Sequence, residues 1–294
     1  MEVRVWGVRG SIPVSSPDTL RYGGNTSCIE IRTHAGERII LDAGTGIREL
    51  GKAMMLEEPG ECAILISHWH WDHIQGLPFF PPLFDPRWKL TVHCHETQGI
   101  ACAQDALNHL FDGRHFPLKF EEISCPPDLL RFALGEPFQL GSTRVQTCPT
   151  NHPGSCVAYR ITAGDWSFAF TGDHENTDLP QPLDSPLRAL LAGCDCVLAD
   201  GQFTEEEYSR RHGWGHSAME SWPPLLAALG VRRLFITHHS PDRTDTELDA
   251  CLGTLRQRFD TLPMSIGFAK EGMRIRKDQI QIPACHRAGV GEIH

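Results

Sequence analysis

Short apolar runs, each followed by a polar residue or a turn, recur along the chain. They occupy residues 3–6, 26–31, 37–42, 63–67, 143–147, 157–161, 166–170, 196–200 and 233–237. Apolar runs of this length that are bounded by turn residues are typical of buried strands. A helix is expected to begin near residue 47. Strand-rich segments in both halves, with helices between the later ones, predict an α/β fold of two packed sheets flanked by helices.

Five of these runs end in an ionisable residue. The five residues are Asp42, His68, Asp173, Asp200 and His238. Ligand sites in open α/β sheets commonly form at the carboxyl ends of strands, because side chains from several strands can converge there. A functional site is therefore expected at these strand ends.

The length of the chain allows one large α/β domain. We predict a single domain over residues 1–294, with a loose tail at 278–294 where the apolar patterning is weak. No apolar run approaches the ~18 residues of a membrane span. The N-terminus begins with strand-like alternation rather than a signal-peptide pattern. These features predict a cytoplasmic protein that does not associate with membranes.

Cysteine usage and net charge disfavour a structural zinc ribbon and a nucleic-acid-binding surface. The eleven cysteines are scattered and form no C-x-x-C pair, so buried free thiols are expected rather than a zinc ribbon. The formal net charge is −10. Proteins that bind polyanions normally show a basic excess or a basic stripe. A long nucleic acid is therefore disfavoured as a substrate.

The segment from residue 68 to residue 73 is rich in metal-ligating side chains. It places His68, His70, Asp72 and His73 in an H-x-H-x-D-H pattern directly after an apolar run. Neutral imidazole and carboxylate groups suit zinc, manganese or iron. A histidine-rich loop with packing or surface roles is the alternative, but four ligand-type residues in one short turn favour a metal site.

Together with three later residues, this motif resembles the metallo-β-lactamase superfamily. The three are His152, Asp173 and His238, and the order and spacing agree over residues 3–275. The resemblance implies an αββα sandwich of two mixed β-sheets flanked by helices. It also implies two divalent metal ions, Zn or Mn with Fe as a further option, which deprotonate a shared water. One metal is assigned to His68, His70 and His152, the other to Asp72, His73 and His238, and Asp173 bridges them.

Two positions within this resemblance narrow the expected chemistry. Flavodiiron relatives have an acidic residue where this chain has His70, and zinc-dependent β-lactamases have a cysteine where it has Asp173. Redox chemistry and antibiotic hydrolysis are therefore both disfavoured. Asp42 resembles the strand-end aspartate that hydrogen-bonds a ligand histidine in this family. Capping of the helix near residue 47 is its alternative role.

Three segments resemble the branch that contains ribonuclease Z and the phosphoribosyl cyclic phosphodiesterase: residues 7–13, 21–28 and 213–217. In that branch the histidine of the last segment, here His216, helps to protonate the leaving oxygen. A carboxylate beside an imidazole raises the pKa of the imidazole and orients it. We therefore predict that the Asp200–His216 pair acts as the general acid. The alternative is that His216 is only the N-terminal residue before a helix at 218–220. The predicted catalytic residues are His216, Asp200 and the ligand Asp72.

These features predict hydrolysis of a small or cyclic phosphodiester, such as a cyclic nucleotide or a cyclic sugar phosphate. A lactone or thioester hydrolase on the same metal site is one alternative, and a non-catalytic nucleotide-sensing module is another. A homodimer is one expected assembly. The roles of His174 and His239 stay open. Core or surface positions are expected for His93, His95, His109 and His115.

Overall fold

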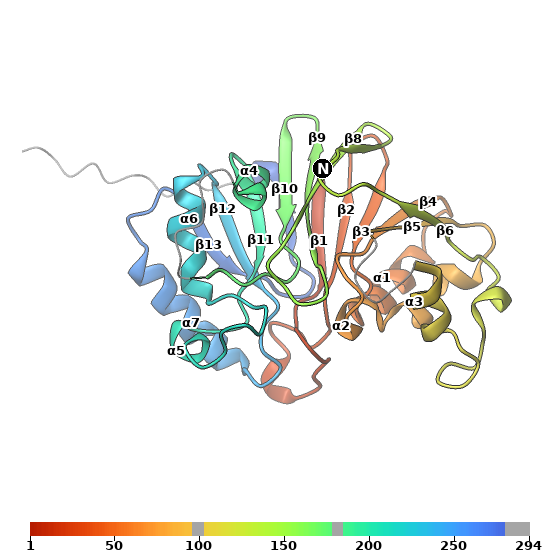
Figure 1. The fold of residues 1–294 in the computed structure, drawn as a ribbon, viewed down its shortest axis with the longest axis horizontal. Helices are drawn as coiled ribbons and strands as arrows, with labels where there is room; N and C mark the ends of the chain where they lie inside the picture. The colour runs from red at the N-terminus through yellow and green to blue at the C-terminus, as the bar shows by residue number, and fades with distance from the viewer. Residues whose placement is uncertain (96–102, 178–184, 280–294) are drawn as a thin grey trace, which may run out of the picture.

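Two seven-stranded β-sheets pack face to face, with helices on their outer faces (Figure 1). The computed structural model describes residues 1–95, 103–177 and 185–279. The predicted tail therefore lies, apart from its first two residues, outside the described residues. Within the described ranges, no helix is both long and apolar enough to cross a membrane. The predicted αββα sandwich is confirmed.

The first sheet has the strand order β14-β1-β2-β3-β4-β5-β6. Neighbours from β14 to β3 are antiparallel, and neighbours from β3 to β6 are parallel. Because β14 pairs with β1, the first and the last described strands lie side by side. The strands are β1 (Glu2–Gly7), β2 (Cys28–Arg32), β3 (Arg38–Leu41), β4 (Glu61–Leu65), β5 (Lys89–Cys94), β6 (Asp128–Arg131) and β14 (Arg274–Arg276).

The second sheet has the order β13-β12-β11-β10-β9-β8-β7. Neighbours from β10 to β13 are parallel, and neighbours from β7 to β10 are antiparallel. The strands are β7 (Phe138–Leu140), β8 (Thr143–Pro149), β9 (Val157–Ala163), β10 (Trp166–Phe170), β11 (Cys196–Asp200), β12 (Arg233–Thr237) and β13 (Ser265–Phe268).

Helices cover both outer faces of the sandwich. Residues of α1 and α3 pack on the first sheet, and residues of α4, α6 and α7 pack on the second. The helices are α1 (Gly46–Met54), α2 (Trp71–Ile74), α3 (Ala103–Leu110), α4 (Pro186–Leu191), α5 (Glu205–Tyr208), α6 (Trp222–Ala228) and α7 (Asp245–Arg258). Short 3-10 turns are η1 (Pro17–Thr19), η2 (Leu77–Phe79), η3 (Pro81–Phe84), η4 (Phe120–Glu122), η5 (Met219–Ser221) and η6 (Lys277–Gln279).

Burial on both faces explains why the central strands are continuous apolar runs. In β4, Ile64 faces the helix layer and Leu65 faces the other sheet. In β11, Val197 and Leu198 alternate in the same way. Side chains at successive strand positions point to opposite faces, so a strand between two apolar layers needs apolar residues at every position. The strands therefore form a rigid frame for the loops at their ends.

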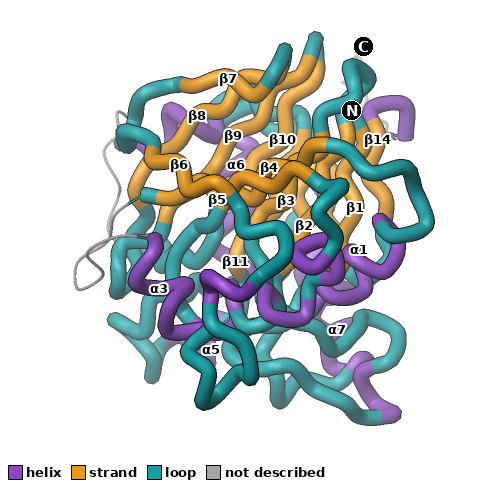
Figure 2. The backbone as a smooth tube through the Cα atoms, turned by 90° about the vertical axis from the view of Figure 1, so that its right-hand side faces the viewer, coloured by secondary structure: helices purple, strands orange, loops and turns teal. Residues whose placement is uncertain are grey.

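The loops that follow β3, β4, β10, β11 and β12 meet at one edge of the sandwich, because these strands run into that edge. Figure 2 shows most helices and long loops beneath the strands in this view. The nine cysteines within the described ranges are all free thiols, and seven of them are buried. The expectation of buried free thiols holds for those seven.

Candidate metal centre

The predicted H-x-H-x-D-H segment lies directly after β4, at the start of the short helix α2. His70 has an extended backbone conformation and occupies the N-cap position of α2, so Asp72 and His73 fall in its first turn. His68 is 1% exposed and His73 is fully buried, whereas His70 reaches the surface. A strand end followed at once by a helix turn thus directs all four side chains to one place.

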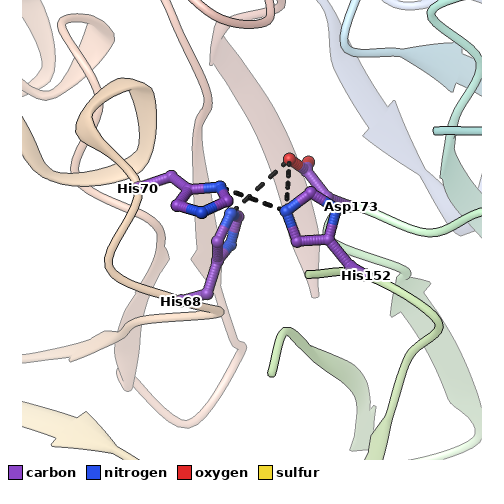
Figure 3. Close-up of side chains that lie close together, drawn as sticks. All are labelled: His68, His70, His152 and Asp173. Carbon is purple, nitrogen blue, oxygen red and sulfur yellow. Dashed lines mark hydrogen bonds and ion pairs between the residues drawn. The ribbon is translucent and has the colours of Figure 1, made fainter. Parts of the chain in front are cut away.

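One group of donors faces an oxygen of Asp173 (Figure 3). His70 Nδ1 lies 3.1 Å from His152 Nε2. Asp173 Oδ2 lies 3.6 Å from His68 Nε2 and 3.8 Å from His152 Nε2. The ligand atoms of these four residues all lie within 4.8 Å of one another. This group opens to solvent at His70.

A second group of donors faces the other oxygen of Asp173. Oδ1 lies 3.3 Å from His73 Nε2 and 3.3 Å from His238 Nε2. Asp72 Oδ2 lies 3.4 Å from His73 Nε2 and 3.0 Å from His238 Nε2. All four members are buried. Asp173 therefore stands between two donor groups and turns one oxygen to each.

Three buried atoms at the centre have no hydrogen-bond partner among the described residues: His68 Nε2, His73 Nε2 and Asp173 Oδ1. Buried polar atoms are nearly always paired, and an unpaired one destabilises the fold. Imidazole nitrogens and a carboxylate oxygen that converge in this way fit divalent cations. The donor set thus suits the metal ions that the sequence predicts.

Three of the candidate ligand imidazoles are each held by a partner at Nδ1, the nitrogen that points away from the donor groups. His73 Nδ1 lies 2.7 Å from Asp42 Oδ2, His152 Nδ1 lies 2.9 Å from the Gly215 carbonyl, and His238 Nδ1 lies 3.1 Å from Gln202 Oε1. An acceptor at Nδ1 leaves Nε2 free of its proton and directed to the centre, where it can bind a metal. The sequence indicated the role of Asp42, and it placed Gly215 in the 213–217 segment, but it assigned no contact with a ligand histidine to Gly215 or Gln202.

Asp42 is committed to this site and not to the helix. Besides His73, its carboxylate accepts hydrogen bonds from the Ser67 amide at 2.7 Å and from the Ser67 hydroxyl at 2.9 Å. The N-cap of α1 is Thr45, which makes no capping hydrogen bond with its side chain. The alternative role of Asp42 as a helix cap is therefore not seen.

The backbone of the N-terminal segment passes very close to the His238 ring. The φ of His238 is +57°, a left-handed conformation that is uncommon outside glycine. A Cβ at position 10 would overlap the His238 ring, so only glycine fits there. The next residue, Ser11, donates its backbone N–H to Asp72 Oδ2 at 2.7 Å. The N-terminal segment that resembles the phosphodiesterase branch thus forms one wall of the centre.

The Asp200–His216 pair lies against the second donor group. His216 Nδ1 is 2.9 Å from Asp200 Oδ2, and the His216 ring stacks on that of His238 with centroids 4.8 Å apart. Burial by itself would lower the pKa of His216, but the negative charges of Asp200, Asp173 and Asp72 raise it to about 9. Asp200 therefore engages Nδ1 of His216, the nitrogen that faces away from Nε2.

The remaining histidines lie away from the donor groups or are held by other partners. His93 stacks on Phe138, and His109 and His115 bond to Asp105 and Asp112 on their own segments. His174 bonds to Asn176, and burial lowers its pKa to about 4. His239 bonds to the Ala269 carbonyl, and burial lowers its pKa to about 3. Both buried histidines therefore have structural partners and are neutral.

Comparison with known proteins assigns the family. The profile described as "Beta-lactamase superfamily domain" matches residues 37–239, which include the whole donor set. The chain belongs to the beta-lactamase superfamily. This membership confirms the predicted family and, with it, the class of metal-dependent hydrolases.

Individual superfamily relatives are distant in sequence but similar over most of their length. Ribonuclease Z of Porphyromonas gingivalis is 22% identical, over 93% of this chain and 98% of the relative. The structure of the metallo-β-lactamase fold protein YhfI of Bacillus subtilis has a TM-score of 0.69 at 19% identity, covering 94% of this chain and 99% of that chain. A diphosphatase from the PhnP family has a TM-score of 0.67 at 19% identity, covering 94% and 97%. These structures share the fold of this chain.

Proposed function

We propose that this protein is a metal-dependent phosphodiesterase for small or cyclic phosphodiesters. The observation that supports this most is the contact between the Asp200–His216 pair and the donor groups around Asp173. A two-metal hydrolase needs an attacking water and a way to protonate the leaving oxygen. The donor groups suit the first requirement, and His216 suits the second.

The proposed ligands follow the geometry of the two groups. His68, His70 and His152 would hold one divalent ion, and Asp72, His73 and His238 the other, with Asp173 between them. When bound, such ions supply an activated water and offset negative charge on the phosphate oxygens. Either zinc or manganese suits these donors.

His216 is the proposed proton donor to the leaving oxygen. Asp200 accepts a hydrogen bond from Nδ1–H of His216, which orients the ring and stabilises its protonated form. Nε2 is the nitrogen left to donate. Asp200 is itself held by the backbone N–H groups of His174 and Gln202, each at 3.1 Å. This fixed carboxylate would return His216 to the same position after each turnover.

A small diester is the proposed substrate for two reasons. The net charge of −10 repels a long polyanion, although one relative is named ribonuclease Z. A structural neighbour is named a diphosphatase of the PhnP family, which supports a small phosphorylated substrate. We therefore favour cyclic nucleotides and cyclic sugar phosphates.

The test is turnover by purified protein loaded with zinc or manganese. The substrates are bis(p-nitrophenyl) phosphate and a panel of cyclic nucleotides, beside a lactone and a thioester. We expect hydrolysis of at least one diester and its loss on chelation. Hydrolysis of only the lactone or thioester, or no diester turnover with both metals bound, would overturn the proposal.

A further inference from the structure

The loop that carries His216 is held by one buried carboxylate, that of Glu175. Glu175 is 5% exposed. It accepts hydrogen bonds from the Gly213 N–H at 2.8 Å, the Gly215 N–H at 2.9 Å and the Tyr208 hydroxyl at 2.8 Å. Gly213 and Gly215 have φ values of +81° and +85°, so the loop takes a backbone path that other residues rarely adopt. The carboxylate fixes this path at two points.

The same residue is tied to the segment that carries His152. The Glu175 N–H donates to the Asn151 carbonyl at 2.9 Å, and Asn151 Nδ2 donates to the Glu175 carbonyl at 3.0 Å. His152 then bonds through Nδ1 to the Gly215 carbonyl. Hydrogen bonds therefore join Glu175 to Gly215, Gly215 to His152, and Glu175 to Asn151, and the Asn151–His152 peptide bond closes the circuit.

Gly215 is linked to both His152 and His216. Its N–H is held by Glu175, its carbonyl faces His152, and the next residue is His216. A Cβ at position 215 would overlap the His152 ring, so the backbone lies directly against the imidazole. A shift of Gly215 would move the acceptor of His152 and the origin of the His216 side chain together.

We infer that Glu175 is a positioning residue for the reaction. By holding the N–H groups of Gly213 and Gly215, it orients His152 toward its metal and His216 toward the leaving oxygen. Among the described residues, Glu175 makes no hydrogen bond to the donor groups or to His216; it reaches them through the Gly215 backbone and through Asn151, the neighbour of His152. Its effect on catalysis is therefore indirect. The kinetic part of this inference rests on the proposed phosphodiesterase function.

The first test is the variant Glu175→Gln. A glutamine keeps the size of the side chain but replaces one carboxylate oxygen with an NH2 group, so that the N–H of either Gly213 or Gly215 loses its acceptor. The matched control is Glu220→Gln, because Glu220 also accepts a backbone N–H, from Glu205 at 3.0 Å, but is not bonded to this loop. Glu175→Asp serves as a second variant, since the shorter carboxylate cannot reach both glycines.

The kinetic readout is dependence on the leaving group. A nitrophenolate leaves with little help, whereas an alkoxide needs the proton. We expect Glu175→Gln to lower kcat about tenfold more on an alkyl diester than on bis(p-nitrophenyl) phosphate, and this extra loss to vanish in a His216→Ala background. Equal losses on both substrates, or full additivity with His216→Ala, would show a purely structural role.

The second readout needs no turnover. Removing an outer partner of a ligand histidine typically weakens metal binding about 10- to 100-fold. We expect Glu175→Gln to weaken one of the two zinc-binding events about tenfold, with thermal stability measured alongside, and Glu220→Gln to weaken neither. Unchanged zinc affinity in Glu175→Gln would overturn the link to His152. Failure of the proposed function would instead appear as no diester turnover by the wild-type protein, with the zinc result still informative.

Discussion

The two halves of the chain supply the donors of the candidate metal centre in different ways. In the first half, His68, His70, Asp72 and His73 come from one short segment after β4. In the second half, each donor comes from its own loop: His152 after β8, Asp173 after β10 and His238 after β12. A compact motif brings its donors together by local geometry, whereas the dispersed donors meet because β8, β10 and β12 run in the same direction and end at one edge.

Support for the donors differs in the same way. In the first half, the partner of His73 is Asp42, at the end of the neighbouring strand β3. In the second half, the partners of His152 and His238 are a loop carbonyl and the side chain of Gln202. The orientation of the second-half imidazoles therefore depends on the paths of loops, whereas that of His73 in the first half depends on a residue at the end of a strand. Asp173 joins the halves.

The largest effect is expected from removing this junction. Asp173→Ala should abolish binding of both ions and lower diester turnover at least about a thousandfold, because each donor group loses its shared carboxylate oxygen. Metal analysis of the purified variant checks this. Asp165→Ala is the control, since Asp165 is an exposed residue paired with Lys277. Retention of two ions by Asp173→Ala would contradict the bridging role.

The next largest effect compares one ligand from each half. His70→Ala and His238→Ala should each lose about one bound ion per chain, because each removes a ligand from a different group. Metal titration followed by calorimetry measures the stoichiometry. Loss of both ions in only one variant would mean that the two donor groups do not bind their ions independently.

Removing the proton donor should leave the metals in place. His216→Ala should lower kcat on alkyl diesters about 100-fold, since a positioned general acid typically contributes this much or more, while the metal content stays unchanged. His109→Ala, far from the donor groups and bonded within α3, should behave as wild type. A His216→Ala variant that loses its metal would instead assign this histidine to the ligands.

The smallest effects are expected for the outer partners. Asp42→Asn and Gln202→Ala should each retain two ions but weaken their binding about 10- to 100-fold. Asp42→Asn should weaken metal binding more than Gln202→Ala does, because Asp42 also accepts two hydrogen bonds from Ser67. Competition with a chelator of known affinity measures both. A larger loss of metal affinity in Gln202→Ala than in Asp42→Asn would contradict this expectation.

The difference between contiguous and dispersed donors also decides which of them could be predicted from the sequence. The first-half motif is visible because its donors are contiguous, and the central strands are visible because burial on both faces makes them apolar throughout. The short edge strands β6, β7 and β14 carry exposed residues and were not predicted. His152, Asp173 and His238 were assigned ligand roles through the family resemblance, since their spacing alone is weak evidence.

Glu175, Gln202 and Ser11 were missed for a physical reason. Glu175 acts on two loop N–H groups, Gln202 on one ring nitrogen, and Ser11 through its backbone. Such contacts depend on loop paths set by positive φ values, which leave no periodic pattern in the sequence. The single domain, the homodimer, the binding of zinc, manganese or iron, the roles of the site residues and the cytoplasmic location stay predictions.

The most direct test is a zinc titration of the metal-free protein with diester turnover followed in parallel. If the two halves build one binuclear phosphodiesterase site around Asp173, turnover of bis(p-nitrophenyl) phosphate should rise and reach its plateau at two zinc ions per chain. A plateau at one ion, or turnover that does not depend on metal, would contradict the account.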